Sequence, residues 1–220
     1  MKHRKVMFAM LVSIFVITVT QSYLWSGEPA ELVKEVILNE SSLNNKIEDI
    51  HERKAKQWEV ISPSFNFAMI SQRVMGEYWE KCLYEEKCEF IELFTSHLKN
   101  SYVKKANPLF GKKILSLNEK QFNKFAKVQT TLLTQSGKEV SADFYLLREN
   151  RKWQICDLVM EGVSLVNNYH SQISNTLVRT SYDELMHTMK EKQNQTKKLT
   201  TIKTASLPRT GQDELTKLIE

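Results

Sequence analysis

Apolar residues recur at spacings of three and four in the first half of the chain, and this period predicts amphipathic helices. The first helix is expected to begin at Pro29 and to continue toward Lys56, with an interruption near Ser41 and Ser42. After Ser62-Pro63-Ser64 breaks the pattern, two further helices are expected over 67–81 and 84–103. The apolar positions of the three stripes are Leu32, Val33, Val36, Ile37, Met69, Ile70, Val74, Trp79, Phe90, Ile91, Phe94, Leu98 and Tyr102.

Beyond Asn107-Pro108 the apolar period changes to two, which is the period of β-strands. In the segment 139–148, alternate residues from Val140 to Leu146 form one apolar face, and Tyr145 and Leu147 make the other face partly apolar. A sheet that is apolar on both faces needs cover on both, and the helices can supply one layer. The four expected strands span 113–117, 124–134, 139–148 and 152–160, with hairpin turns at 135–138 and 149–151.

Helical spacing returns after Gly162. Ser164 is a suitable N-cap for a helix that reaches about Val178, and Ser181 with Glu184 forms a capping box that opens a short last helix. From residue 193 the chain is polar and is expected to be a tail over 193–220. The order of elements predicts an α+β fold, with a four-stranded antiparallel curved sheet wrapped by about six or seven helices.

The first two dozen residues have the pattern of an export signal. Positive charges at Lys2, Arg4 and Lys5 precede an apolar run from Val6 to Val19, which is shorter than the roughly 20 residues of a membrane-spanning helix. No Ala-x-Ala cleavage site follows, so a cleaved signal peptide over 1–26 and a retained anchor both stay open. The folded domain is then expected over 27–192, and the periplasm is the expected location.

The net charge of +5 is not a sign of nucleic-acid binding. Three of the positive charges lie in the expected signal peptide, and removing them leaves 28 basic against 26 acidic residues. Lys and Glu alternate along most of the chain, which is typical of a solvated surface. We therefore expect no nucleic-acid partner.

Catalytic and metal-binding signatures are absent from the sequence. Asp157 is flanked by apolar residues and is interpreted as a buried hydrogen-bond acceptor, and His170 as a satisfied polar residue at the edge of the core. The sequence contains no P-loop, GxGxxG, HExxH or GxSxG motif, and its cysteines form no CxxC pair. A disulfide between Cys82 and Cys88 stays open. We expect neither an enzyme nor a bound cofactor or metal.

One block of sequence resembles a known family. Residues 153–172, Trp-Gln-Ile-Cys-Asp-Leu-Val-Met-Glu-Gly-Val-Ser-Leu-Val-Asn-Asn-Tyr-His-Ser-Gln, are similar to the signature of the MlaC family, also called toluene-tolerance auxiliary proteins. Phe65-Asn66-Phe67 resembles the family's Phe-Asp-Phe, and 74–79 resembles its Val-Leu-Gly-x-x-Trp. The resemblance extends over about 29–192. Two departures are Asn66 in place of Asp and His170 in place of Arg, which puts in doubt any role of that Arg toward a headgroup or partner.

The resemblance implies a periplasmic carrier that holds phospholipid acyl chains in an apolar cavity between sheet and helices. It implies exchange of lipid with an inner-membrane ABC transporter that carries an MCE-domain ring, and with an outer-membrane lipoprotein–porin complex, so that outer-membrane lipid asymmetry is maintained. A carrier of another apolar lipid such as a hopanoid, and a non-catalytic interaction module with a filled core, remain alternatives. The residues expected to line the lipid pocket are Val74, Trp79, Phe94, Leu98, Val128, Phe144, Leu146, Trp153, Ile155 and Tyr169.

Overall fold

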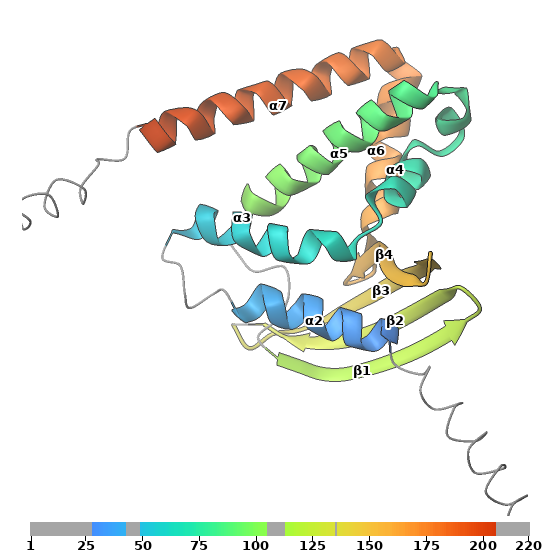
Figure 1. Ribbon diagram of the computed structural model, residues 1–220, viewed down its shortest axis with the longest axis vertical. Coiled ribbons are helices and arrows are strands. Elements are labelled where there is room, and N and C mark those ends of the chain that lie inside the picture. The colour runs from blue at the N-terminus through green and yellow to red at the C-terminus, as the bar shows by residue number, and fades with distance from the viewer. Residues whose placement is uncertain (1–27, 43–48, 105–112, 135, 206–220) are drawn as a thin grey trace, which may run out of the picture.

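The computed structural model describes residues 28–42, 49–104, 113–134 and 136–205. It is α+β, as predicted: α2 and α3 lie on one side of an antiparallel sheet, and α4–α7 form a helical layer beyond α3 (Figure 1). The helices are α2 (Glu28–Ser42), α3 (Ile50–Ile61), α4 (Phe67–Met75), α5 (Tyr84–Lys104), α6 (Leu165–Arg179) and α7 (Tyr182–Ala205), with 3₁₀-helices η2 (Ser62–Ser64) and η3 (Gly76–Lys81). The strands are β1 (Lys113–Phe122), β2 (Phe125–Leu133), β3 (Glu139–Glu149), β4 (Lys152–Met160) and β5 (Val163–Ser164).

The sheet is a simple meander in the order β1-β2-β3-β4-β5. The four expected strands are present, and the two-residue β5 adds a fifth that pairs with β4. The first strand is longer than predicted, because β1 stays paired with β2 from Lys113 to Phe122. Register shifts between Ile114 and Ser116 in β1, and at the pairing of β3 with β4, interrupt the ladder and favour the bending of the sheet.

In the described part of the chain, α2 and α3 cover the inner face of the sheet, whereas α4 and α6 contact the sheet at β4. The inner face carries Val128 and Phe144, which are fully buried under α2 and α3. On the outer face Lys127 stands opposite Tyr145, which is 37% exposed, and Phe125 is 52% exposed. Among the described residues this part of the outer face is exposed, and its apolar side chains are interleaved with Lys127 and Asp143, which form an ion pair at 2.8 Å.

The predicted helix over 67–81 is divided in two at Gly76, which ends α4 with φ +57°. A Cβ atom at this position would lie 2.7 Å from Cε1 of His170 on α6, so α4 and α6 can approach this closely only at a glycine. Nδ1 of His170 is 2.9 Å from the carbonyl oxygen of Val74. His170 is thus a satisfied polar residue in a helix contact, as the sequence suggested.

The buried residues form two separate cores. The sheet core joins α2, α3 and the C-terminal end of α5 to the inner face of the sheet, and the helical core joins α4, α6, α7 and the rest of α5. Trp58 and Phe65 pack against both. The interior therefore has a boundary between two apolar units, and the segment 58–65 crosses it.

The last helix extends past the expected boundary at residue 192. Ser181 caps α7 by accepting a hydrogen bond from the Glu184 amide at 3.2 Å, as predicted, and the helix continues to Ala205. Lys190 of α7 pairs with Glu89 of α5 at 2.6 Å. The expected signal peptide over 1–26 and the end of the tail over 206–220 lie outside the described residues. Within the described part of the chain, none of the helices combines the length and hydrophobicity that crossing a bilayer requires.

Candidate functional site

A cavity of about 250 Å³ lies at the boundary between the two cores. Leu158 and Ile61 of the sheet core face it from one side, and Ile70 and Leu98 of the helical core face it from the other. Among the described residues, fifteen line the cavity, and twelve of these are apolar or aromatic: Trp58, Ile61, Phe65, Phe67, Ile70, Leu98, Tyr102, Leu158, Met160, Val163, Leu165 and Tyr169. This lining suits an apolar guest.

An aromatic cluster forms one wall of the cavity. The ring centroids of Trp58 and Phe67 are 5.6 Å apart, those of Phe65 and Phe67 are 6.0 Å apart, and those of Trp58 and Tyr102 are 5.7 Å apart. The backbone holds this wall in place, because Phe65 forms a parallel bridge to Ile155 and the Asn66 amide donates to the Ile155 carbonyl at 2.8 Å. Asn66 then caps α4 by accepting from the Met69 amide at 2.9 Å, which confirms the predicted N-cap.

The polar residues of the lining lie toward solvent. Asn168 is exposed, and Ser101 and Ser164 are only partly buried. The apolar Val163 next to Ser164 is also exposed. The cavity thus has an apolar interior and a polar edge near β5 and the start of α6. This arrangement fits an amphipathic molecule that keeps its polar end in water.

A buried cation lies just behind the aromatic wall. Lys54 is 1% exposed, and its Nζ lies 4.8 Å from the ring centroid of Tyr102, a cavity residue. Gln57 is fully buried beside it, and its Oε1 is 3.5 Å from the Tyr102 hydroxyl. This arrangement was not predictable from sequence, because Lys54 falls in a run of charged residues that is typical of a solvated helix face.

Asp157 fixes the other wall. Its Oδ1 accepts from the Leu158 and Val166 amides at 2.8 and 3.1 Å, and its Oδ2 accepts from the Ser164 hydroxyl at 2.8 Å. Ser164 in turn caps α6 by accepting from the Asn167 amide at 3.0 Å, as predicted. The carboxylate thus joins β4 to the start of α6, and its role as a buried acceptor agrees with the interpretation from sequence.

The ionisable groups described near the cavity take part in structural contacts. The Asp157 carboxylate, which accepts from the Ser164 hydroxyl, also accepts from two amides, and the Arg73 guanidinium lies 3.5 Å from its Oδ2. Burial raises the pKa of the nearby Cys156 thiol, which makes this sulfur a poor nucleophile. Among the residues that the structure describes, no cluster of His, Cys, Asp and Glu is arranged to hold a metal ion. The arrangement is suited to binding.

The ten residues predicted to line the pocket fall into three groups. Leu98 and Tyr169 line the cavity. Val74 and Phe94 are buried in the helical core and Trp79 packs against it, and the ring of Phe94 supports Tyr169 at 5.2 Å. The remaining five belong to the sheet core: Val128, Phe144, Leu146, Trp153 and Ile155. Contact between lipid and any of the ten remains a prediction.

Several cavity residues were missed as pocket residues. Phe65 and Phe67 flank the predicted cap at Asn66, and this dense aromatic pair beside a helix start was the signal that could have indicated them. Trp58 sits among charged residues on α3. Val163 lies at the end of the sheet, where the strand pattern no longer distinguishes a core position from a cavity position.

Comparison with known proteins gives the family. The family model described as MlaC protein matches residues 31–191, most of the chain. The chain belongs to the MlaC family. A curated relative, the intermembrane phospholipid transport system binding protein MlaC of Haemophilus influenzae, is 21% identical over 196 residues, which is 86% of this chain and 90% of the relative. A phospholipid-binding protein of Ralstonia solanacearum, solved in complex with a phospholipid, superposes with a TM-score of 0.60 at 19% identity, over 76% of this chain and 96% of that one.

The structure gives a physical meaning to the MlaC signature in this chain. Glu161 and Gly162, with φ +47° and +82°, form the tight turn that pairs β5 back onto β4. Ser164 and Asp157 then start α6 as described above. The block that carries the family resemblance is thus the turn that places Leu165 and Tyr169 against the cavity.

Proposed function

We propose that this protein is a lipid carrier that holds phospholipid acyl chains in the cavity between the two cores. The observation that carries the proposal is the apolar cavity with a polar edge, in a chain of the MlaC family. The phospholipid bound by the Ralstonia solanacearum protein supports the proposal from a similar fold.

The physical need for such a carrier is large. Transfer of a methylene group out of water contributes about 0.8 kcal/mol, so two long acyl chains face a penalty on the order of 20 kcal/mol in water. A dry cavity removes this penalty without any chemical step. Directional transport then has to come from an energy-driven partner, because the carrier itself only exchanges lipid.

The size of the cavity limits what it holds in this conformation. A cavity of about 150 Å³ can bind benzene, and pockets for larger ligands range over about 300–1,000 Å³. At about 250 Å³ the present cavity takes a segment of one chain. A complete two-chain phospholipid requires the two cores to move apart along their boundary, where Trp58 and Phe65 join them.

The carrier is proposed to act in the periplasm, between an inner-membrane ABC transporter with an MCE-domain ring and an outer-membrane lipoprotein–porin complex. In that role it contributes to outer-membrane lipid asymmetry. The name of the Haemophilus influenzae relative, which describes an intermembrane phospholipid transport system, supports this setting. The export pattern in the first two dozen residues supports it independently.

Lipid extraction from the purified protein tests the proposal. We expect mass spectrometry of an organic extract to detect phospholipid in stoichiometric amount, and Ser101→Phe to lower that amount strongly. Ser101 lines the cavity, and a phenylalanine ring is as large as the benzene that occupies a cavity of about 150 Å³. Ser171→Phe, the same change at an exposed position of α6, is the matched control.

The outcomes separate the alternatives. An extract that contains a hopanoid or another apolar lipid in place of phospholipid would change the ligand but keep the carrier. Absence of any lipid, together with no binding of added phospholipid, contradicts the carrier and favours an interaction module.

A further inference from the structure

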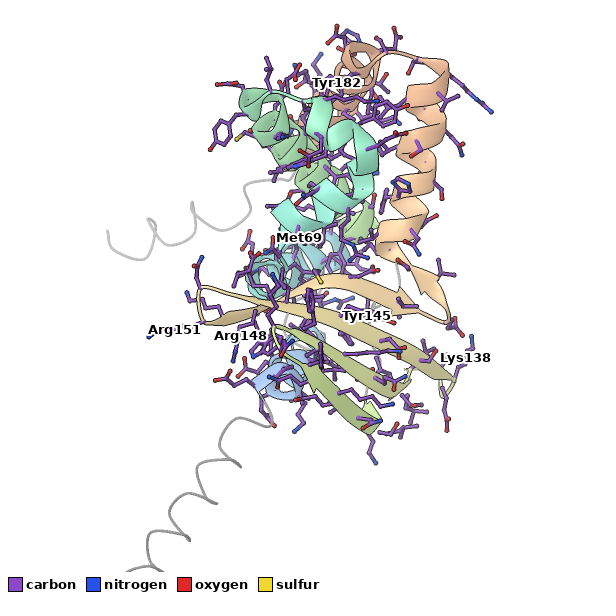
Figure 2. All side chains as sticks on the ribbon, turned by 90° about the vertical axis from the view of Figure 1, so that its right-hand side faces the viewer. Met69, Lys138, Tyr145, Arg148, Arg151 and Tyr182 are labelled. Atoms are coloured by element: carbon purple, nitrogen blue, oxygen red, sulfur yellow. The ribbon has the colours of Figure 1, made fainter. Side chains whose placement is uncertain are left out.

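Two hairpin tips meet at one end of the sheet. The β1–β2 turn contains Asn123 and Lys124, and the β3–β4 turn contains Asn150 and Arg151. The Arg148 amide donates to the Lys124 carbonyl at 2.8 Å and holds the two tips side by side. Figure 2 shows Arg148 and Arg151 at this end of the sheet and Lys138 at the opposite end. We call the outer surface at this end the tip patch.

Two phenylalanines stand exposed in the tip patch. Phe122 and Phe125 are cross-strand partners on either side of the β1–β2 turn, and they are 76% and 52% exposed. Phe125 shares the outer face with Lys127 and Tyr145, because alternate residues of a strand point to the same side. Two neighbouring exposed aromatic rings at a protruding turn have no role in the packing of the sheet core.

Positive charge is concentrated in the two hairpin ends, although the Arg148 guanidinium lies 5.4 Å from the ring centroid of Trp153, a residue of the sheet core. The segments 118–128 and 143–154 together carry six Lys and Arg residues against three carboxylates. The carboxylates are already engaged, since Asp143 pairs with Lys127, Glu119 accepts from the Ala30 amide, and Glu149 accepts from the Asn66 side chain. Lys120, Lys124, Arg151 and Lys152 make no salt bridge within the described ranges.

Two details of the tip patch oppose stability. Lys120 stands directly opposite Lys127 in the ladder, and like charges in that position are unfavourable. Arg151 has φ +65°, a left-handed conformation that glycine adopts without strain and arginine does not. Positive charge is therefore present where the fold alone would favour a neutral residue.

We propose that the tip patch docks on an anionic lipid bilayer, with Phe122 and Phe125 inserted at the interface and the lysines on the headgroups. Aromatic rings with adjacent cations suit such an interface, because the rings enter the acyl boundary and the cations stay with the phosphates. A protein partner is less suited, since lysine is depleted in protein interfaces and four of the six cations are lysines. A narrow convex tip enters a fluid surface without needing a complementary pocket.

The tip patch also adjoins the cavity wall. Nδ2 of Asn66 donates to Oε2 of Glu149 at the end of β3, at 3.1 Å, and Asn66 separates the cavity residues Phe65 and Phe67. This hydrogen bond connects the end of β3, next to the tip patch, to the aromatic wall of the cavity. Docking itself uses only the outer surface and does not depend on a lipid in the cavity.

Vesicle co-sedimentation of the purified protein tests the inference. We expect binding to phosphatidylcholine vesicles that contain phosphatidylglycerol, weak binding to phosphatidylcholine alone, and loss of binding when salt rises from about 0.1 M to about 1 M, where the Debye length falls to about 3 Å. Phe122→Ala should lower the partition coefficient about tenfold or more. Arg151→Gly should lower it about fivefold while leaving the urea midpoint equal or higher, because glycine relieves the left-handed strain.

Matched variants keep the result interpretable. Tyr84→Ala removes another exposed aromatic ring, 77% exposed on α5, and should leave vesicle binding unchanged. Ser101→Phe should also leave it unchanged, which separates this inference from the proposed carrier function. Absence of binding to anionic vesicles overturns the inference. Salt-dependent binding that Phe122→Ala does not alter also overturns it, because such binding is electrostatic adsorption to the headgroups without insertion of the ring.

Discussion

Replacing Gly76 with alanine brings two separate penalties to one residue. The backbone there has φ +57° and ψ −129°, a conformation that residues with a Cβ atom rarely adopt. The added Cβ would also lie 2.7 Å from Cε1 of His170, whose ring is held by the Val74 carbonyl at 2.9 Å. The alanine therefore meets backbone strain and a steric clash between α4 and α6.

The two penalties have similar sizes. A residue held in a sparsely populated backbone region costs about 1–3 kcal/mol, and overpacking costs about 1–3 kcal/mol. We expect Gly76→Ala to lower the free energy of unfolding by about 2–6 kcal/mol, a large part of the roughly 5–15 kcal/mol that stabilises a typical domain. Equilibrium urea unfolding followed by circular dichroism measures the loss.

A double-mutant cycle with His170→Ala separates the strain from the clash. His170→Ala alone should cost about 1 kcal/mol for the lost hydrogen bond. In the double variant the backbone strain remains but the clash is gone, so the loss should be smaller than the sum of the single losses by about 1–3 kcal/mol. If the two losses add to within about 0.5 kcal/mol, the contact with His170 is not the reason for glycine at this position.

Two further predictions concern Asp157 and alkaline pH. Asp157→Asn should lower the free energy of unfolding by about 2–4 kcal/mol, because the buried carboxylate accepts from two amides and a hydroxyl. The control Asp143→Asn, which breaks a partly exposed ion pair, should cost less than about 1 kcal/mol. Equal losses in urea unfolding would contradict the role of Asp157 as a buried acceptor. Burial raises the pKa of the Cys82, Cys156 and Tyr182 side chains, so at alkaline pH the folded state keeps protons that the unfolded state releases. The urea midpoint should therefore fall as the pH rises past 9.0, the usual pKa of a thiol. Cys82→Ala with Cys156→Ala should reduce this fall, and an unchanged slope would refute the assignment.

Local signals in the sequence predicted much of the fold. The caps at Asn66, Ser164 and Ser181 were found because each uses a side chain and an amide three residues away. The four main strands followed from their alternation. The break at Gly76 was not predictable, since its cause is a ring on α6 that only the tertiary structure brings near. The length of β1 was underestimated because an edge strand with a mostly polar pattern carries little periodic signal.

The candidate site was harder to predict than the fold. Periodicity identifies the buried side of an element, and all ten predicted residues lie in or against a core or line the cavity. Periodicity does not reveal where a cavity is left between two cores. Phe144 and Ile155 have the same alternation of apolar residues as the strand residues that line the cavity, but they pack against residues of α2 and α3 in the sheet core. Trp58 was missed because the neighbouring charges on α3 hide its inward position.

The division of the interior into two cores also determines how the protein opens locally. With Trp58 and Phe65 as the residues that pack against both, amides in the sheet core and in the helical core can exchange with solvent through separate opening events. A guest in the cavity touches Ile61 and Leu158 on one side and Ile70 and Leu98 on the other, so each opening event would also have to release the guest. Occupancy would thereby couple the exchange protection of the sheet core more closely to that of the helical core.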